Sequence, residues 1–163
     1  MNDLPWMIEA KKVMGLHETR DHAALAKWLK SDGKTLGDPS KLPWCGDFVD
    51  TAIELALPDE PRPGKLGENP YWALNWLLFG KACNPAYGAV VAFERPGGGH
   101  VGFLVGQDEK RFYVLGGNQG DTVSITPIDR GRARGYRWPT TYKGKPGDLP
   151  KMKSATASSK NEA

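Results

Sequence analysis

Hydrophobic residues recur at helical spacing through the first half of the chain, up to about residue 80. The clearest case follows Cys45, where apolar residues three and four positions apart form one stripe that Pro58 ends. Such a stripe predicts an amphipathic helix that covers a core with one face. Spacing of this kind predicts helices at 5–14, 21–30, 45–57 and 71–79.

From Gly88 onward the apolar residues alternate with polar ones or run continuously, a pattern typical of β-strands. Because the helices come first and the strands second, we expect an α+β fold, with N-terminal helices packed on a C-terminal antiparallel sheet of about five strands. A doubly wound parallel sheet would need the two to alternate. The predicted strands are 88–94, 100–106, 111–117, 122–128 and 134–139.

The chain has 163 residues, 39% of them hydrophobic and 25% charged, which suits one globular domain. The net charge of +3 comes from the end of the chain, because residues 143–163 carry five lysines and two acids. We therefore expect a folded domain at 1–142 and a basic, disordered tail at 143–163. The tail is interpreted either as a loose tether to an anionic polymer or as a solubilising end.

Several classes of protein are disfavoured. No apolar run approaches the ~18 residues of a membrane span, and the first residues lack the pattern of a signal peptide. Cys45 and Cys83 fit neither a zinc motif nor a disulfide framework. The arginines at 130, 132 and 134 alternate as on one face of a strand, but acids balance them, so no nucleic-acid partner is expected.

Cys45 is the more informative of the two cysteines because it opens the strongest predicted helix. The free N–H groups and the dipole at a helix N-terminus favour a thiolate over a thiol, and a thiolate is a nucleophile. The same N–H groups can form part of an oxyanion hole. The alternative is a buried core cysteine, since free cysteine is often buried. Cys83 lacks such a setting and is interpreted as structural.

His100 and Asn118 are the residues that could complete a catalytic set with Cys45. His100 follows three glycines and begins a predicted strand, where another element can come close. Asn118, at the end of the next strand, could accept from the imidazole N–H and orient the ring, as in a Cys-His-Asn set. The alternatives are a surface histidine at a turn and an ordinary hairpin-turn asparagine.

Taken together, these residues resemble the CHAP superfamily of cysteine, histidine-dependent amidohydrolases and peptidases, which is related to the NlpC-type cell-wall peptidases. Within it, the chain is similar to a small subgroup from phages and prophages whose members are often described as peptidoglycan hydrolases. The resemblance spans about residues 5 to 139. It rests on PWCGDFV at 43–49, GAVVAF at 88–93, GHVGFLV at 99–105, LGGNQ at 115–119 and GYRWP at 135–139.

The resemblance implies a papain-like fold and hydrolysis of an amide bond in peptidoglycan. Cys45 would be the nucleophile, His100 the base and then the acid, and Asn118 the orienting residue. We expect Trp44 and Gly99 to contact the substrate. The rival hypothesis is an inactive CHAP-like module that binds the cell wall or sits in a virion.

Two departures from the family pattern bear on these expectations. Many CHAP members carry a glutamate two residues before the position of Asn118, where this chain has Gly116. Some members bind calcium through acidic residues around the cysteine. Asp38 and Asp47 fall at two of those positions, but Leu36 occupies a third. We therefore expect no metal site and no cofactor.

The resemblance also sets expectations about partners and location. The protein would be made in the cytoplasm without a signal peptide, would act in the periplasm or cell wall, and would be a monomer. A holin, if it is a phage endolysin, or a secretion apparatus, if it is an exported effector, would give this bacteriolytic enzyme access to its substrate. Bacterial peptidoglycan is the expected partner.

Overall fold

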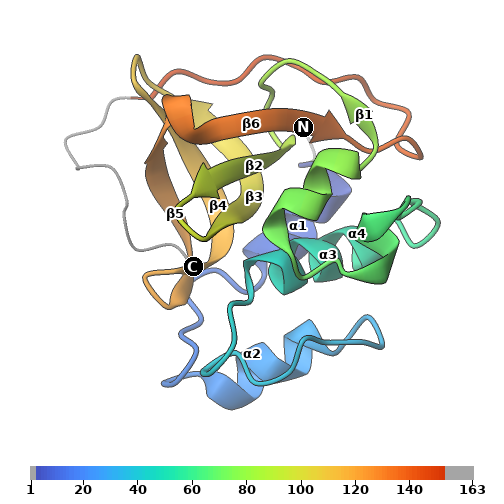
Figure 1. Cartoon of the computed structure of the whole chain (residues 1–163), viewed down its shortest axis with the longest axis vertical. Helices are drawn as coiled ribbons and strands as arrows, with labels where there is room; N and C mark the ends of the chain where they lie inside the picture. The colour runs from blue at the N-terminus through green and yellow to red at the C-terminus, as the bar shows by residue number, and fades with distance from the viewer. Residues whose placement is uncertain (1–2, 153–163) are drawn as a thin grey trace.

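The computed structural model describes residues 3–152 and has an α+β architecture (Figure 1). The helices come from the first half of the chain, and the second half forms an antiparallel sheet, as the change in hydrophobic pattern predicted. Helices α1, α3 and α4 lie on one side of the sheet, whereas α2 lies apart from it and packs on α3.

The helical segments follow the predicted ones closely. The segment expected at 71–79 is a 3-10 helix, and Lys65–Glu68 was not predicted because four residues are too few to show a periodicity. The helices are α1 (Pro5–Lys11), α2 (His22–Leu29), α3 (Cys45–Ala56), α4 (Lys65–Glu68) and η1 (Ala73–Leu78), with a further short 3-10 turn, η2 (Arg130–Arg132).

Each of the five predicted strands is present, and a two-residue strand extends the sheet at one edge. That edge strand, β1, pairs with Arg137 and Trp138 of β6. The order across the sheet is β1-β6-β2-β3-β4-β5. The strands are β1 (Lys81–Ala82), β2 (Val90–Arg95), β3 (Gly98–Gln107), β4 (Arg111–Gln119), β5 (Thr122–Asp129) and β6 (Ala133–Trp138).

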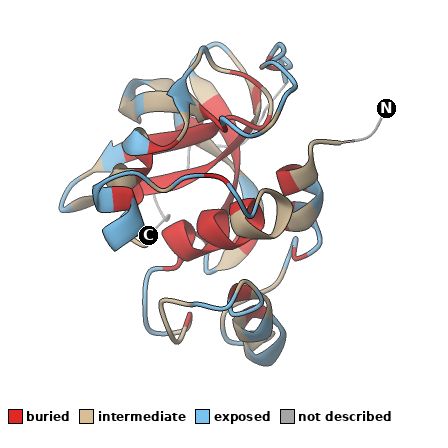
Figure 2. Ribbon diagram, turned by 90° about the vertical axis from the view of Figure 1, so that its right-hand side faces the viewer, coloured by how far each residue is buried: buried red, intermediate tan, exposed pale blue. Residues whose placement is uncertain are grey.

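Helix α3 forms the centre of the core. Its apolar stripe packs on β3 and β4, and the Phe48 and Phe103 rings lie 6.1 Å apart in an edge-to-face arrangement. Residues 45–53 of this helix are all buried, and Figure 2 shows most of the helix and the middle of the sheet in the colour of buried residues. Gly117 permits the approach of β4, since a Cβ there would lie 2.7 Å from Phe48 and Trp44. The start of α3 is thereby held against the sheet.

The chain after residue 142 continues to pack on the domain, which corrects the predicted boundary and the prediction of disorder for residues 143–152. Leu149 is buried, and the Gln107 N–H donates to the Pro150 carbonyl at 2.8 Å. The indole of Trp138 donates to the Gly144 carbonyl at 2.9 Å. A single leucine and a few backbone groups hold a segment whose composition is otherwise that of a tail. The rest of the predicted tail, 153–163, lies outside the described residues.

Within the described residues no helix is both long and apolar enough to cross a bilayer. The longest helix among residues 3–152 is α3, which has 12 residues.

Replacing Leu149 by alanine should lower the free energy of unfolding by about 2 kcal/mol, because the leucine fills a site in the core. Lys145→Ala, at an exposed position of the same segment, is the matched control and should be neutral. Urea denaturation of both variants measures the difference. Equal stability of the two variants would mean that residues 143–152 do not contribute to the fold.

Candidate active site

Cys45 is the first residue of α3 and is almost completely buried. The first bond within the helix runs from the Phe48 N–H to the Trp44 carbonyl at 2.9 Å. The N–H groups of Cys45, Gly46 and Asp47 therefore have no acceptor within the helix. Such groups, with the positive end of the helix dipole, stabilise negative charge on the sulfur or on an oxygen beside it.

The pKa of the Cys45 thiol lies below its ordinary value, even though burial, the largest single influence, raises it. The largest influences that lower it are a hydrogen bond with His100 and the charge on its ring. The backbone N–H groups of Val101 and Gly46 add to the effect. A lowered pKa in spite of burial is the condition of an activated cysteine rather than of an inert core cysteine.

His100 lies on β3 and is completely buried, so it is not a surface histidine. It is opposite Phe93 of β2 in the strand register, and the two rings stack with centroids 6.5 Å apart. The stacking contact with Phe93 and the paired backbone of β3 restrict the orientation of the His100 ring. The imidazole is therefore held in place before any substrate arrives.

The third residue of the site is Gln119, whose Oε1 lies 2.8 Å from Nε2 of His100. The orientation of this amide is determined by its other contacts. Its Nε2 donates to the carbonyls of Val114 (3.1 Å) and Ser124 (2.8 Å), which can only accept. Gln119 must therefore present its oxygen to His100.

This arrangement selects one tautomer of the histidine. Because the Gln119 oxygen can only accept, Nε2 of His100 carries the proton and donates it. In the neutral ring Nδ1 is then unprotonated, and it is the nitrogen left to interact with the Cys45 thiol. The site holds a base in the correct form to remove the thiol proton.

The prediction that Asn118 orients His100 is wrong by one position. A β-bulge between Gly116 and Gln119 inserts an extra residue into β4, and Asn118 adopts a positive φ of 58°. The bulge exchanges the faces of the strand, so that Gln119 takes the side on which simple alternation would place residue 118. The signal in the sequence was the asparagine itself, since Asn tolerates positive φ better than most residues.

Gly116 explains how Gln119 fits beside the histidine. A Cβ at Gly116 would lie 2.5 Å from Oε1 of Gln119 and 3.3 Å from Nε2 of His100. The glutamine amide therefore fills the space that a side chain at position 116 would enter. The polar partner of His100 therefore comes from position 119 rather than from position 116.

Trp44 and Gly99, both predicted to contact the substrate, lie in different surroundings. Trp44 is buried, and its indole N–H donates to Oε1 of Glu18 at 3.0 Å, so the side chain supports the site from inside. A Cβ on Gly99 would lie 2.8 Å from the side chain of Leu74, so that side of the residue is covered by η1. The side chain exposed beside the start of β3 is Trp72, which lies against Gly98.

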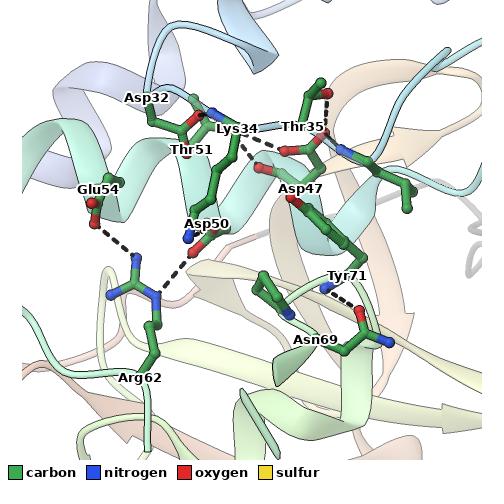
Figure 3. Close-up of polar contacts among 12 residues, drawn as sticks. Asp32, Lys34, Thr35, Asp47, Asp50, Thr51, Glu54, Arg62, Asn69 and Tyr71 are labelled. Atoms are coloured by element: carbon green, nitrogen blue, oxygen red, sulfur yellow. Dashed lines mark hydrogen bonds and ion pairs between the residues drawn. The ribbon is translucent and has the colours of Figure 1, made fainter. Parts of the chain in front are cut away.

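Asp47, in the first turn of α3, is buried and lies at the centre of a polar cluster (Figure 3). Its Oδ2 accepts from the Thr35 hydroxyl at 2.9 Å and from the Leu36 N–H at 3.0 Å. Burial raises its pKa to about 6, with smaller upward contributions from Asp32 and Asp50. The carboxyl ties the loop before Cys45 to the helix that Cys45 begins.

Asp50, one turn further along α3, is buried and paired with two cations (Figure 3). Oδ1 lies 2.9 Å from Nε of Arg62, and Oδ2 lies 3.3 Å from Nζ of Lys34. Asp38, one of the positions associated with calcium, accepts from Ser40 and faces His22, which lower its pKa to about 2. Within residues 3–152 no group of three or more His, Cys, Asp or Glu side chains is placed to hold a metal ion.

Cys83 differs from Cys45 in each respect that matters for reactivity. It is half-buried, lies in a loop after β1, and is not bonded to Cys45. Burial raises its pKa, and Arg137 and Lys81 offset this only in part. A raised pKa fits the structural role predicted for this cysteine.

No protein-family model matches the chain, and no curated protein matches it.

Gln119→Ala should raise the apparent pKa of the Cys45 thiol, because the imidazolium loses its acceptor and the thiolate–imidazolium pair is weakened. Asn118→Ala is the matched control and should leave that pKa unchanged. The rate of alkylation by iodoacetamide as a function of pH, in a Cys83→Ser background, measures it. Equal profiles for the two variants would contradict the role of Gln119.

The buried carboxyl of Asp47 should make the protein less stable as the pH rises from about 4 to 7. Its folded pKa of about 6 is above the unfolded value, so the penalty is absent at low pH and grows as the pH passes through 6. The contribution is about 2–3 kcal/mol. Asp47→Asn should flatten this dependence in urea unfolding measured from pH 4 to 8. An unchanged slope would mean that another group causes it.

Proposed function

We propose that the protein is a cysteine-dependent hydrolase that cleaves an amide bond in the peptide part of bacterial peptidoglycan. The observation that carries the proposal is the buried series Cys45–His100–Gln119, with the thiol at a helix N-terminus and the histidine held in one tautomer. These are the three requirements of thiol-dependent acyl transfer: a nucleophile, a base and a residue that orients the base.

In the first half of the reaction, Nδ1 of His100 takes the proton of the Cys45 thiol. The sulfur attacks the amide carbonyl and forms a C–S bond, while the electron pair of the C=O moves to the oxygen. The free N–H groups at the start of α3 stabilise that oxyanion. His100 then gives its proton to the amide nitrogen, the C–N bond breaks, and an amine leaves behind a thioester on Cys45.

In the second half, His100 removes a proton from a water molecule, whose oxygen attacks the thioester carbonyl. The C–S bond breaks, a carboxylic acid is released and the sulfur recovers its proton from His100. Throughout, the Gln119 oxygen accepts from Nε2 and stabilises the imidazolium that forms in both steps. At the end of the cycle Cys45 and His100 have returned to their starting protonation states.

The choice of peptidoglycan rests on the motifs shared with the CHAP superfamily, at 43–49, 88–93, 99–105 and 115–119. A feature of the surface is compatible with it. Trp72 exposes about half of its side chain beside Gly98, two residues before His100. An exposed indole next to a catalytic histidine offers a flat apolar surface to a sugar or a peptide.

The same resemblance gives the biological setting of the proposal. The enzyme would be a monomer that acts on the cell wall from the periplasmic side after a holin or a secretion apparatus gives it access. It would be a bacteriolytic, endolysin-like protein of a phage or prophage, or an exported effector. The rival, an inactive wall-binding module, drew its support from the missing acid at position 116. The Gln119 amide beside His100 weakens that argument.

Digestion of purified peptidoglycan should release soluble fragments with the natural protein and none with Cys45→Ala, because the thiol is the nucleophile. Cys83→Ser is the matched control and should retain activity. Mass spectrometry of the fragments would identify the new amine and carboxyl termini and so the bond that is cut.

Two outcomes would contradict the proposal. Release by Cys45→Ala would exclude the thiol mechanism. Failure of the natural protein to release fragments from walls of several chemical types, while it still sediments with them, would favour the binding module.

A further inference from the structure

A small pocket opens beside the catalytic residues and is not used by the steps above. It has a volume of about 220 Å³, which suits one side chain rather than a whole ligand. It lies close to the reacting groups in the sequence and in space, because Pro43 is two residues before Cys45 and Asn118 directly precedes Gln119. Its wall is formed by Glu18, Pro39, Ser40, Lys41, Leu42, Pro43, Asn118 and Asp121.

Asn118 is the first indication that the pocket takes a ligand. The residue is 95% buried and lines the pocket, yet its amide is not among the buried polar atoms without a partner, so the amide reaches the open space of the pocket. An amide that is held in a largely buried residue and opens into a pocket offers a ligand both a donor and an acceptor. The positive φ of Asn118, which results from the bulge, turns the residue away from His100 and into this wall.

Glu18 and Asp121 both line the pocket, and their backbones are paired with each other. The Glu18 N–H donates to the Asp121 carbonyl at 2.9 Å, and a bridge between His17 and Thr122 extends this pairing. Glu18 also accepts from the Trp44 indole through Oε1, which leaves Oε2 for another donor. With Lys41 as the one cation in the wall, the lining has a net negative charge.

We propose that this pocket is a specificity subsite that binds a protonated amine on the wall peptide, with Glu18 and Asp121 pairing the ammonium group and Asn118 hydrogen-bonding the adjacent peptide group. The inference rests on the proposed function, because it assigns the ligand of the same active site. Unlinked diamino-acid side chains of a wall peptide supply such an amine, and a cross-linked side chain does not. The subsite would direct cleavage to peptides that are not yet cross-linked at that amine.

The test is calorimetric binding of two synthetic stem peptides to the Cys45→Ala protein. One peptide carries lysine as its diamino acid, and the other carries norleucine, which lacks the amine but has a similar length. The lysine peptide should bind about tenfold more tightly, since a charge-assisted hydrogen bond contributes about that much. Glu18→Gln and Asp121→Asn should each reduce this preference, while Glu68→Gln, an exposed acid outside the pocket, should not.

These substitutions are chosen to preserve the fold. Glutamine at position 18 keeps an oxygen for the Trp44 indole, and asparagine tolerates the positive φ of 63° at position 121. Asn118→Ala should weaken the binding of both peptides equally, because it contacts the peptide group rather than the amine.

Equal affinity for the two peptides, a preference that survives both acidic substitutions, unchanged binding by Asn118→Ala, or no binding of either peptide would overturn the inference. Failure of the proposed function is a separate result. If only the proposed function fails, the Cys45→Ala protein will still prefer the lysine peptide, but the protein with an intact thiol will cleave neither the peptides nor the wall.

Discussion

The hydrogen bond between His100 and Gln119 is the contact on which the rest of the site depends. Because Gln119 is itself held by two backbone carbonyls, it offers only its oxygen, and the histidine must carry its proton on Nε2. That choice leaves Nδ1 free of a proton toward Cys45, whose thiol is acidified in spite of its burial. A neutral amide thus sets the protonation of the whole series without a buried negative charge, which would be costly to desolvate.

The fold brings these residues together through the packing of α3 on β3 and β4. Gly117 lets β4 come close to the beginning of the helix, and Gly46 does the same for the loop at residues 70–71 on another side. The buried Asp47 and Asp50 anchor the helix to the loop before it and to Arg62. Cys45 is therefore carried by a buried helix that is anchored on several sides, a setting that suits the proposed catalytic role.

The sequence predicted the α+β class, the helix that Cys45 opens and the five main strands, because long hydrophobic patterns report directly on burial. It placed Cys45 correctly as the first residue of its helix, whereas His100 is the third residue of β3 rather than its first. It missed Gln119 because a one-residue bulge exchanges the two faces of β4. A prediction based on strict alternation of side chains does not detect such a bulge. It also assigned Trp44 to the substrate, since a tryptophan beside a nucleophile gives no sign of whether it faces inward. Residues 143–152 pack on the domain largely through Leu149. A single apolar residue in a basic segment is too weak a pattern to predict this packing.

The central claim is that His100 lowers the pKa of the buried Cys45 thiol, and titration of the ultraviolet absorbance of the thiolate tests it most directly. The Cys83→Ser protein leaves Cys45 as its one cysteine. Its titration should have a midpoint below the ordinary thiol value of 9.0. Adding His100→Ala should move the midpoint above that value, because burial then acts without a compensating charge. The same midpoint with and without His100 would contradict the account.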